Sequence, residues 1–280
     1  TVVEAVDNQP WSGEANVHVS IANWVKTQDS ALLPKTRRLW FKTTQRGAKD
    51  YDLDCREVEQ INSALSDAVD LGKAAILLSN TDPKRVYQGV TPGHEAFVLD
   101  GDSKAMLSAD GKSGAIIHPY LTGRELVAGD GTPERFLIDF QRRSILEAQS
   151  FPNAFAHVKN NVLPDRLSRA EAGKDTNGNM RSHHKQFLDR WWALAWDRKE
   201  LFTSFSSLQG RFVCCSRVTK RPIFLFLTTA VWPSDKVQAF LFDDDYSFGI
   251  LQSNAHWQWF LQKCSKLKSD YSYSIESVFD

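Results

Sequence analysis

A basic stretch in the last third of the chain has the residue types that contact nucleic acid. "RFVCCSRVTKRPIFLF" (211–226) holds four basic residues within eleven positions and no acidic residue, namely Arg211, Arg217, Lys220 and Arg221. Arginine can pair with the O6 and N7 atoms of guanine in the major groove, and lysine contacts to phosphates fix the register of a protein on a duplex. The stretch therefore predicts a DNA-contacting segment, with a solvated hairpin as the alternative.

The residues around this stretch predict a hairpin that would hold it. Pro222 interrupts the basic run, and the apolar segment 223–227 that follows is typical of a strand. The basic residues then lie at a strand end and in the connecting loop, where side chains project from a rigid sheet.

A second basic segment lies nearer the N-terminus. "PKTRRLWFKTTQRGAK" (34–49) has six basic residues and no acid, among them Arg37, Arg38 and Lys42. We expect a strand and a loop in this segment. We interpret these three side chains as candidate phosphate contacts, and a solvated strand and loop is the alternative.

The tetrapeptide Asn8-Gln9-Pro10-Trp11 nearly matches Asn-Pro-Pro-aromatic, a motif that binds the amino group of a flipped base. In that motif the asparagine side chain and a proline carbonyl accept hydrogen bonds, and the aromatic ring stacks on the base. Gln9 replaces the first proline here, and no glycine-rich cofactor loop precedes the segment. We therefore predict that Pro10, Trp11, Ser12 and Gly13 form a connecting loop between two strands.

The order of predicted elements indicates an α+β fold. Strand-like patterns occupy the first residues, a short amphipathic helix is expected over 58–71, and residues 141–209 are expected to be mostly helical. Within this region, "RWWALAW" (190–196) predicts three tryptophans on a helix that packs into the core. The residues from 211 onward are strand-like again. This order predicts antiparallel β-sheets with a central helical segment.

Composition limits the classes of protein that the chain can represent. It has 280 residues, 42% hydrophobic and 24% charged, and a formal net charge of zero. A neutral body excludes a generally polybasic binder, so a nucleic-acid site must be a local basic patch.

No apolar run is long enough to span a membrane, and no secretory signal is evident. Four cysteines without a Cys-x-x-Cys motif predict reduced thiols and a cytoplasmic protein. The chain begins inside a strand-like pattern without methionine, which we interpret as a fragment.

Ten sequence blocks, considered together, resemble one family. In chain order they are "QPWSGEANVHVSIANWVK", "INSALSD", "GHEAFVL", "IIHPYLTGREL", "RFLIDF", "SFPNAFAHVKNNVLPDR", "RWWALAWDRKEL", "RFVCCSRVTKRPIF", "FDDDYSFGILQSNAHWQWF" and "LKSDYSYSIESVFD". They are similar to the C-terminal part of single-chain, adenine-specific DNA methyltransferases of the MmeI-like, type IIL restriction–modification kind. The resemblance covers essentially the whole chain.

The resemblance implies a division of the chain and a set of partners. Residues 1–50 would be the last strands of a methyltransferase sheet, and residues 51–280 a target recognition domain that reads duplex DNA. The upstream methyltransferase domain of the same parent chain would be the second partner. The resemblance also nominates Thr219, with Arg217, Lys220 and Arg221, as residues that contact DNA. By the same resemblance, Trp11 would stack on the extruded adenine, with a hydrophobic plug under the loop as the alternative. No cofactor is expected in this fragment. S-adenosylmethionine, and Mg²⁺ for cleavage, would serve the longer parent, which by resemblance methylates adenine N6.

Two other classes of function remain as alternatives. A stand-alone methyltransferase or nuclease is disfavoured because the sequence has neither a glycine-rich cofactor loop nor a carboxylate–lysine cluster with nuclease spacing. A protein-interaction module would use the helical region 141–209 to dock on catalytic domains. Because docking by these helices is compatible with DNA recognition elsewhere, the two functions do not exclude each other.

Overall fold

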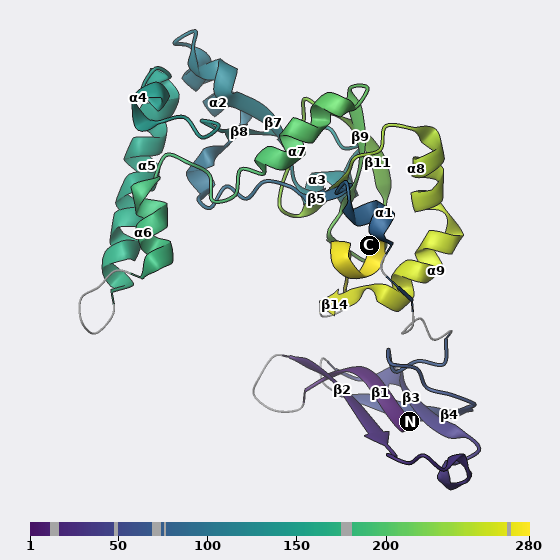
Figure 1. The fold of residues 1–280 in the computed structure, drawn as a ribbon. Helices are drawn as coiled ribbons and strands as arrows, with labels where there is room; N and C mark the ends of the chain where they lie inside the picture. The colour runs from purple at the N-terminus through teal and green to yellow at the C-terminus, as the bar shows by residue number, and fades with distance from the viewer. Residues whose placement is uncertain (12–16, 48–49, 69–73, 76, 175–180, 268–269) are drawn as a thin grey trace.

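The computed structural model describes residues 1–11, 17–47, 50–68, 74–75, 77–174, 181–267 and 270–280. The N-terminal strands form a four-stranded sheet in the order β2-β1-β3-β4 (Figure 1). Their bounds are β1 Val2–Pro10, β2 His18–Trp24, β3 Arg37–Gln45 and β4 Tyr51–Val58. β1 runs antiparallel to β2 and parallel to β3, and β3 runs antiparallel to β4. The domain boundary predicted at residue 50 therefore falls between two paired strands of this sheet.

One face of this sheet carries a small apolar core. Ala5 and Leu39 are buried against Ile61, which belongs to the segment after β4. That segment is not the helix predicted for 58–71: over residues 59–68 the chain forms turns, and the remainder lies outside the described residues. The Asn62 side chain accepts hydrogen bonds from the backbone of Ala64 and Ser66, at 2.9 and 3.1 Å. These local bonds replace helical ones, which is why the helix prediction was wrong.

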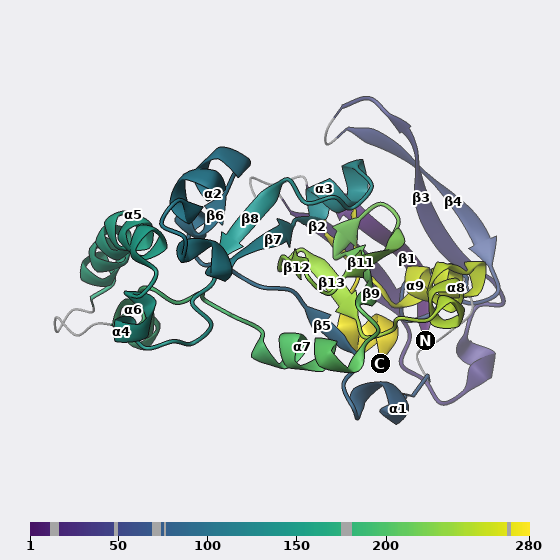
Figure 2. The same ribbon diagram turned by 90° about the horizontal axis from the view of Figure 1, so that it is seen from above.

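Residues 77–280 contain three further sheets and most of the helices (Figures 1 and 2). The sheet orders are β12-β7-β8-β6, β11-β9-β13-β5 and β10-β15-β14. The strands are β5 Val86–Gln88, β6 Val98–Leu99, β7 Ile117–Leu121, β8 Arg135–Ile138, β9 Arg211–Ser216, β10 Val218–Thr219, β11 Phe224–Thr228, β12 Trp232–Pro233, β13 Val237–Phe240, β14 Ser265–Leu267 and β15 Asp270–Ser272. In the described part of these sheets, β7 with β12 is parallel and the other pairs are antiparallel.

The helices lie around and beside these sheets. They are α1 Leu78–Thr81, α2 Gly101–Ser108, α3 Gly123–Ala128, α4 Ile145–Ala148, α5 Pro152–Ala172, α6 Ser182–Asp189, α7 Lys199–Ser204, α8 Asp245–Gln252 and α9 Asn254–Lys263. The helices between residues 145 and 204 account for the helical region that the sequence predicts. The expected α+β class with antiparallel sheets and a central helical segment is confirmed. Among the described residues, no helix has the length and apolar character needed to cross a bilayer.

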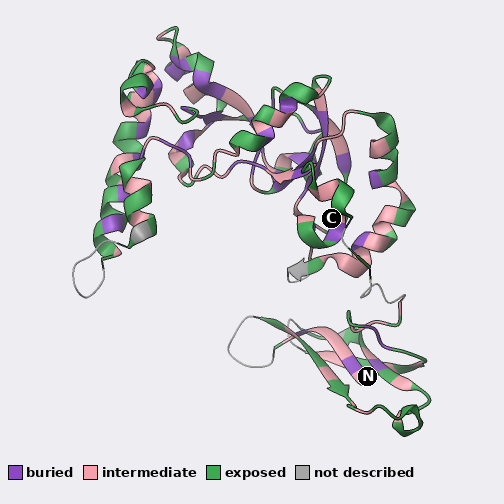
Figure 3. Ribbon diagram, in the orientation of Figure 1, coloured by how far each residue is buried: buried purple, intermediate pink, exposed green. Residues whose placement is uncertain are grey.

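The strand β9 is buried on both faces, which explains its nearly continuous apolar sequence. Phe212 and Cys214 pack into one core cluster, whereas Val213 and Cys215 pack into another on the opposite face. Figure 3 shows buried residues concentrated along these central strands and exposed residues along the helices. Burial raises the pKa of both cysteine thiols, and the structure records all four cysteines as free. β9 pairs antiparallel with β11, so the predicted hairpin is confirmed.

The segment after α6 is a turn, and not the tryptophan-bearing helix predicted for residues 190–196. The buried guanidinium of Arg166, from α5, donates hydrogen bonds to the backbone carbonyls of Phe187, Arg190 and Ala193, at 3.0 to 3.2 Å. These carbonyls are satisfied from another helix, so the chain can leave the helical path after Asp189. Core packing was nevertheless predicted correctly for Trp191, which is buried, and for Trp192, which is partly buried against the same cluster. It was wrong for Trp196, which is 56% exposed.

Candidate nucleic-acid interface

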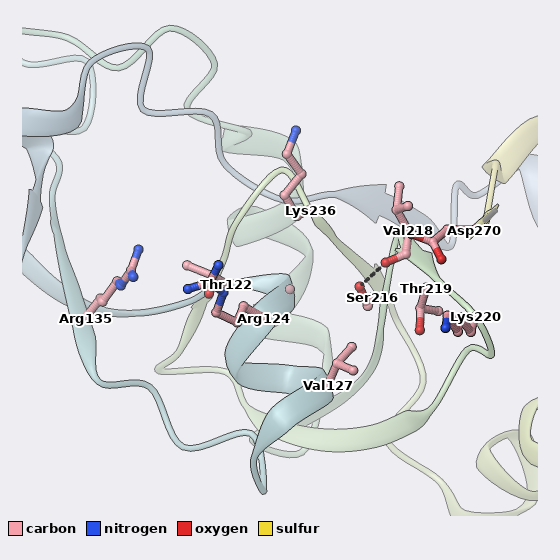
Figure 4. Close-up of a pocket in the computed structure, with 11 residues that line it drawn as sticks. Thr122, Arg124, Val127, Arg135, Ser216, Val218, Thr219, Lys220, Lys236 and Asp270 are labelled. Atoms are coloured by element: carbon pink, nitrogen blue, oxygen red, sulfur yellow. Dashed lines mark hydrogen bonds between the residues drawn. The ribbon is translucent and has the colours of Figure 1, made fainter. Parts of the chain in front are cut away.

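An open groove of about 770 Å³ lies where α3, β8, β10 and β15 converge (Figure 4). Its lining residues are Thr122, Gly123, Arg124, Val127, Arg135, Ser216, Val218, Thr219, Lys220, Lys236 and Asp270. Four of these residues are basic and one is acidic. Arg124 and Arg135 line one wall in Figure 4, and Thr219, Lys220 and Asp270 line the facing wall. A net positive groove of this kind attracts a polyanion.

The wall that carries Thr219 and Lys220 is fixed on two sides by backbone hydrogen bonds. The Arg217 amide donates to the Lys236 carbonyl at 2.8 Å, and the Tyr273 amide donates to the Arg217 carbonyl at 2.8 Å. Ser216 Oγ donates to the Val218 carbonyl at 3.1 Å within the same segment. The residues after β9 are therefore held between the strand β13 and the strand β15, and the groove has a rigid wall.

The facing wall depends on the local sequence at the start of α3. Thr122 and Glu125 form a capping box in which the Glu125 carboxylate accepts a hydrogen bond from the Thr122 amide at 2.7 Å. The helix start packs tightly against the central sheet. A Cβ atom on Gly123 would lie 3.1 Å from both the Lys236 carbonyl oxygen and Ser216 Oγ. This close approach leaves the exposed Arg124 side chain at the groove.

The groove's cations differ in how far acids neutralise them. Lys236 Nζ lies 2.9 Å from the Asp235 carboxylate, and Arg135 Nε lies 3.9 Å from Glu125. The basic side chain of each pair is largely exposed to water, so each pair contributes little to stability. Arg124 and Lys220 make no ion pair with any acid among the described residues. These two side chains are thus the ones most available to a phosphate or a base.

Of the hairpin residues predicted from sequence, two line the groove and two flank it. Thr219 and Lys220 are lining residues. Thr219 Oγ1 donates to the Arg221 carbonyl at 3.1 Å and accepts from the Arg221 amide at 3.4 Å, which stabilises the loop. The Arg221 guanidinium lies 5.2 Å from the ring centroid of Trp257 in α9, a cation–π contact. Arg217 is half-buried and is held through its backbone.

Arg211 lies at the opposite end of β9 and is not among the groove's lining residues. Its guanidinium donates to the Asp243 carbonyl at 2.8 Å and pairs with the Asp245 carboxylate at 2.9 Å. The same group lies 3.9 Å from the centroid of the Phe226 ring. These contacts engage the side chain within the protein. The structure thus separates Arg211 from the other basic residues of its stretch.

The basic residues predicted near the N-terminus also lie outside the groove, on the strand β3. Arg37 donates a hydrogen bond to the Glu59 carbonyl, and Arg38 pairs with Glu4 at 3.1 Å. Lys42 Nζ lies 5.0 Å from the ring centroid of Tyr51. The run lacks acids in its own sequence, but neighbouring segments supply partners for its side chains. Their predicted role as phosphate contacts stays a prediction.

Trp11 follows directly after β1, and 45% of its surface is exposed. Its amide donates to the Val17 carbonyl at 2.9 Å, so the residue lies at the start of the loop between β1 and β2. Residues 12–16 lie outside the described residues. Of the predicted connecting loop, Pro10 belongs to β1 instead, where it pairs with His18, and Ser12 and Gly13 lie outside the described residues. The base-stacking role of Trp11 stays a prediction.

Four groove residues were not identified from the sequence: Arg124, Arg135, Lys236 and Asp270. They are isolated charges in four separate segments, and no spacing rule connects them. The Thr-x-x-Glu capping box at residue 122 was a usable signal, because it predicts a helix start that would place the arginine after Gly123. In the part of the chain that the structure describes, no group of three or more metal-ligating side chains could hold a metal ion.

Comparisons with known proteins show the family of this chain and the similarity of its fold. A family model described as "MmeI, target recognition domain" matches residues 79–280. A solved structure of the Type IIL restriction-modification enzyme MmeI in complex with DNA is similar, with a TM-score of 0.68 and 15% sequence identity. The similarity covers 99% of this chain and 34% of that chain, so this chain spans about a third of its length. Among curated proteins, none matched. The resemblance inferred from the sequence blocks is confirmed, because the family model covers well over half of the chain: the protein belongs to the MmeI target recognition domain family.

Proposed function

We propose that this chain recognises a specific sequence in duplex DNA and that the basic groove receives the DNA. The observation that carries the proposal is the position of Thr219 and Lys220. Both come from the hairpin loop, and both line the groove with basic residues from three other segments. The fold similarity to MmeI, which was solved in complex with DNA, supports this use of the groove.

The charges of the groove suit a duplex. The chain has no net charge, yet the groove has four basic residues and one acid. Each cation that neutralises a phosphate releases condensed counterions, so binding weakens steeply with salt. Arg124 and Lys220 have no acidic partner among the described residues and contribute most to this term. Arg217 and Arg221 flank the groove and extend the contact along the duplex.

A fluorescence anisotropy titration with labelled duplex DNA tests the proposal. Arg124→Ala should weaken binding to all sequences and lower the slope of log K against log salt by about 1. Lys185→Ala is the matched control, because it removes the same charge from the exposed surface of α6, where Lys185 pairs with Asp189 at 2.6 Å. It should leave the slope unchanged. If the unaltered chain binds no member of a random duplex pool at low salt, the proposal is wrong.

We further propose that the longer parent protein methylates adenine N6 with S-adenosylmethionine and uses Mg²⁺ if it also cleaves DNA. The sequence blocks support this, together with the fraction of the MmeI chain that the present chain spans. The upstream methyltransferase domain would be the second partner, with residues 1–50, which hold β1 to β3, as its last strands and Trp11 beside the flipped base. Four free cysteines support a cytoplasmic setting. The similarity to a restriction-modification enzyme supports a bacterial one.

Calorimetric titration of the chain with S-adenosylmethionine separates this reading from a stand-alone methyltransferase. The chain has no glycine-rich cofactor loop in its sequence, so we expect no heat of binding. Tight binding would instead favour the stand-alone enzyme. Addition of the upstream domain should restore cofactor binding and methyl transfer.

A further inference from the structure

A second cavity, separate from the groove, is lined by the helices α5 and α6. Its volume is about 250 Å³, and four of its lining residues can carry a positive charge: Arg166, Arg169, His183 and His184. Among the described lining residues, Asp165 is the only acid. Both Figure 1 and Figure 2 place α5 and α6 at one side of the molecule, away from α3, which borders the groove. The cavity and the groove share no described lining residue.

Arg166 gives this cavity a buried positive charge that no acid neutralises. The residue is 7% exposed, and none of the described acids lies within 4.0 Å of its guanidinium. Its hydrogen bonds go to backbone carbonyls at and after the end of α6. An arginine carries further N–H donors, and these have no acceptor in the described part of the chain. Because a buried charge costs free energy unless it is paired, an anion in the cavity would stabilise this arginine.

The acid of the cavity is already engaged, which leaves the positive charges in excess. Asp165 Oδ2 lies 2.9 Å from Arg169 Nε and 3.5 Å from His94 Nε2. The Arg169 side chain is largely exposed. Because a guanidinium presents several N–H donors in a planar fork, this one ion pair leaves Arg169 able to bind a further anion.

The two histidines of α6 add to the basic lining. The ring centroids of His183 and His184 lie 3.9 Å apart. The His184 ring packs closely on the end of α5, since a Cβ atom on Gly173 would overlap it. Desolvation, and then the positive charges of His183 and Arg181, lower the pKa of His184. These neighbouring charges make the local field positive, and a positive field attracts anions.

A backbone phosphate of DNA fits the chemistry of this cavity. The planar fork of an arginine pairs with two oxygens of one phosphate. A carboxylate of a partner protein has similar oxygens, but the proposed function brings a polyanionic duplex to this chain, which favours phosphate. We propose that this cavity binds one backbone phosphate of the duplex outside the groove, with exposed Arg169 at its mouth and buried Arg166 at its floor. The inference rests on the proposed function of the chain.

Hydroxyl-radical footprinting tests the inference on a long duplex that contains a site selected from a random pool. The unaltered chain should protect the backbone at the site and a second backbone segment on one side of it. Arg169→Ala should lose the flanking protection, keep the protection at the site, and lower the slope of log K against log salt by about 1. Lys185→Ala is the matched control, because it removes a positive charge from α6 outside the cavity, where Lys185 pairs with Asp189 at 2.6 Å. It should keep both protected segments.

The outcomes separate the inference from the function on which it rests. If the unaltered chain binds no duplex, the proposed function is wrong and the inference with it. If it protects only the selected site, or if Arg169→Ala keeps the flanking protection, only the inference is wrong. Saturable binding of inorganic phosphate that depends on Arg169, with DNA binding unchanged, would show an anion site unrelated to DNA and would overturn the inference. Loss of affinity for the upstream domain alone would assign the cavity to an acidic protein segment and would also overturn it.

Thermal unfolding of each variant checks the fold. Arg169→Gln, which keeps much of the length of the side chain, replaces the alanine variant if that one unfolds. Arg166 is left unaltered in these experiments, because its hydrogen bonds to three backbone carbonyls support the fold itself.

Discussion

The substitution Asp139→Asn tests how much unfolding free energy is lost by burying a carboxylate directly after β8. Asp139 is 3% exposed, and its Oδ1 accepts a hydrogen bond from the Gln141 amide at 2.8 Å. Burial raises the pKa of this carboxyl group from 3.8 to about 6, and the nearby negative charge of Asp197 adds to the effect. The folded state therefore binds this proton more tightly than the unfolded state does.

The sign and size of the effect follow from this pKa. Because the folded pKa lies above the unfolded one, the stabilising effect of the proton is complete below pH 4 and is lost as pH rises to about 6. A difference of roughly two pKa units corresponds to ~3 kcal/mol of unfolding free energy. Asparagine can still accept the bond from Gln141 and carries no charge. We therefore expect Asp139→Asn to be more stable than the unaltered protein by up to ~3 kcal/mol at pH 7, and equally stable at pH 4.

Urea unfolding of both proteins between pH 4 and pH 8 measures this difference. Other titrating groups are common to both proteins and cancel, including His118, whose pKa is lowered by burial to about 4. Asp110→Asn is a control of opposite sign. Although desolvation opposes it, hydrogen bonds from Ser113 and Asn153 lower the pKa of Asp110, so its variant should lose stability at pH 7. A pH-independent difference for Asp139→Asn, or a loss of stability at pH 7, would refute the reasoning.

Two further predictions concern close contacts in the fold. Arg166→Met should lower the unfolding free energy by roughly 3 kcal/mol, because three backbone carbonyls lose their donor, and the loss can be measured by urea unfolding. Gly89→Ala should destabilise the protein by about 2 kcal/mol or more, because its Cβ would lie 2.2 Å from the Pro233 carbonyl oxygen. Gly101→Ala is the control for thermal unfolding: it has nothing within 4 Å and should leave stability unchanged or slightly raised. Equal melting temperatures for the two glycine variants would contradict the steric argument.

The predictions that succeeded depend on patterns contained within one segment. The strand β9 lies in a segment that was predicted to be strand-like, and the hairpin to β11 was predicted from the basic loop and from Pro222 before an apolar run. These signals are local and require no knowledge of which segments pack against the strands. Thr219 and Lys220 lie at the groove because they occupy the end of this hairpin, and their role as DNA contacts stays a prediction.

The predictions that failed were overturned by side-chain hydrogen bonds, which the spacing of apolar residues does not reveal. The apolar spacing over 58–71 fits a helix, but the buried Asn62 side chain bonds its own neighbours and forms a turn instead. At the tryptophan segment, the deciding donor is Arg166, which lies more than twenty residues earlier in the chain. The groove shows the same limit, because Arg124, Lys236 and Asp270 come from segments that meet only in the folded chain.

Charge pairing explains why basic runs were an incomplete guide to the interface. The chain has as many acidic as basic residues, so most cations can find an acid once the chain folds. Arg38 and Arg211 pair with Glu4 and Asp245, which lie on other segments, and neither pair can be read from the basic runs themselves. Arg124 has acidic Glu125 as its sequence neighbour, yet the capping box commits that carboxylate to the start of α3. A cation is available to DNA when the nearby acidic side chains are engaged in other contacts of the fold. The number of basic residues in a short stretch of sequence does not reveal those contacts.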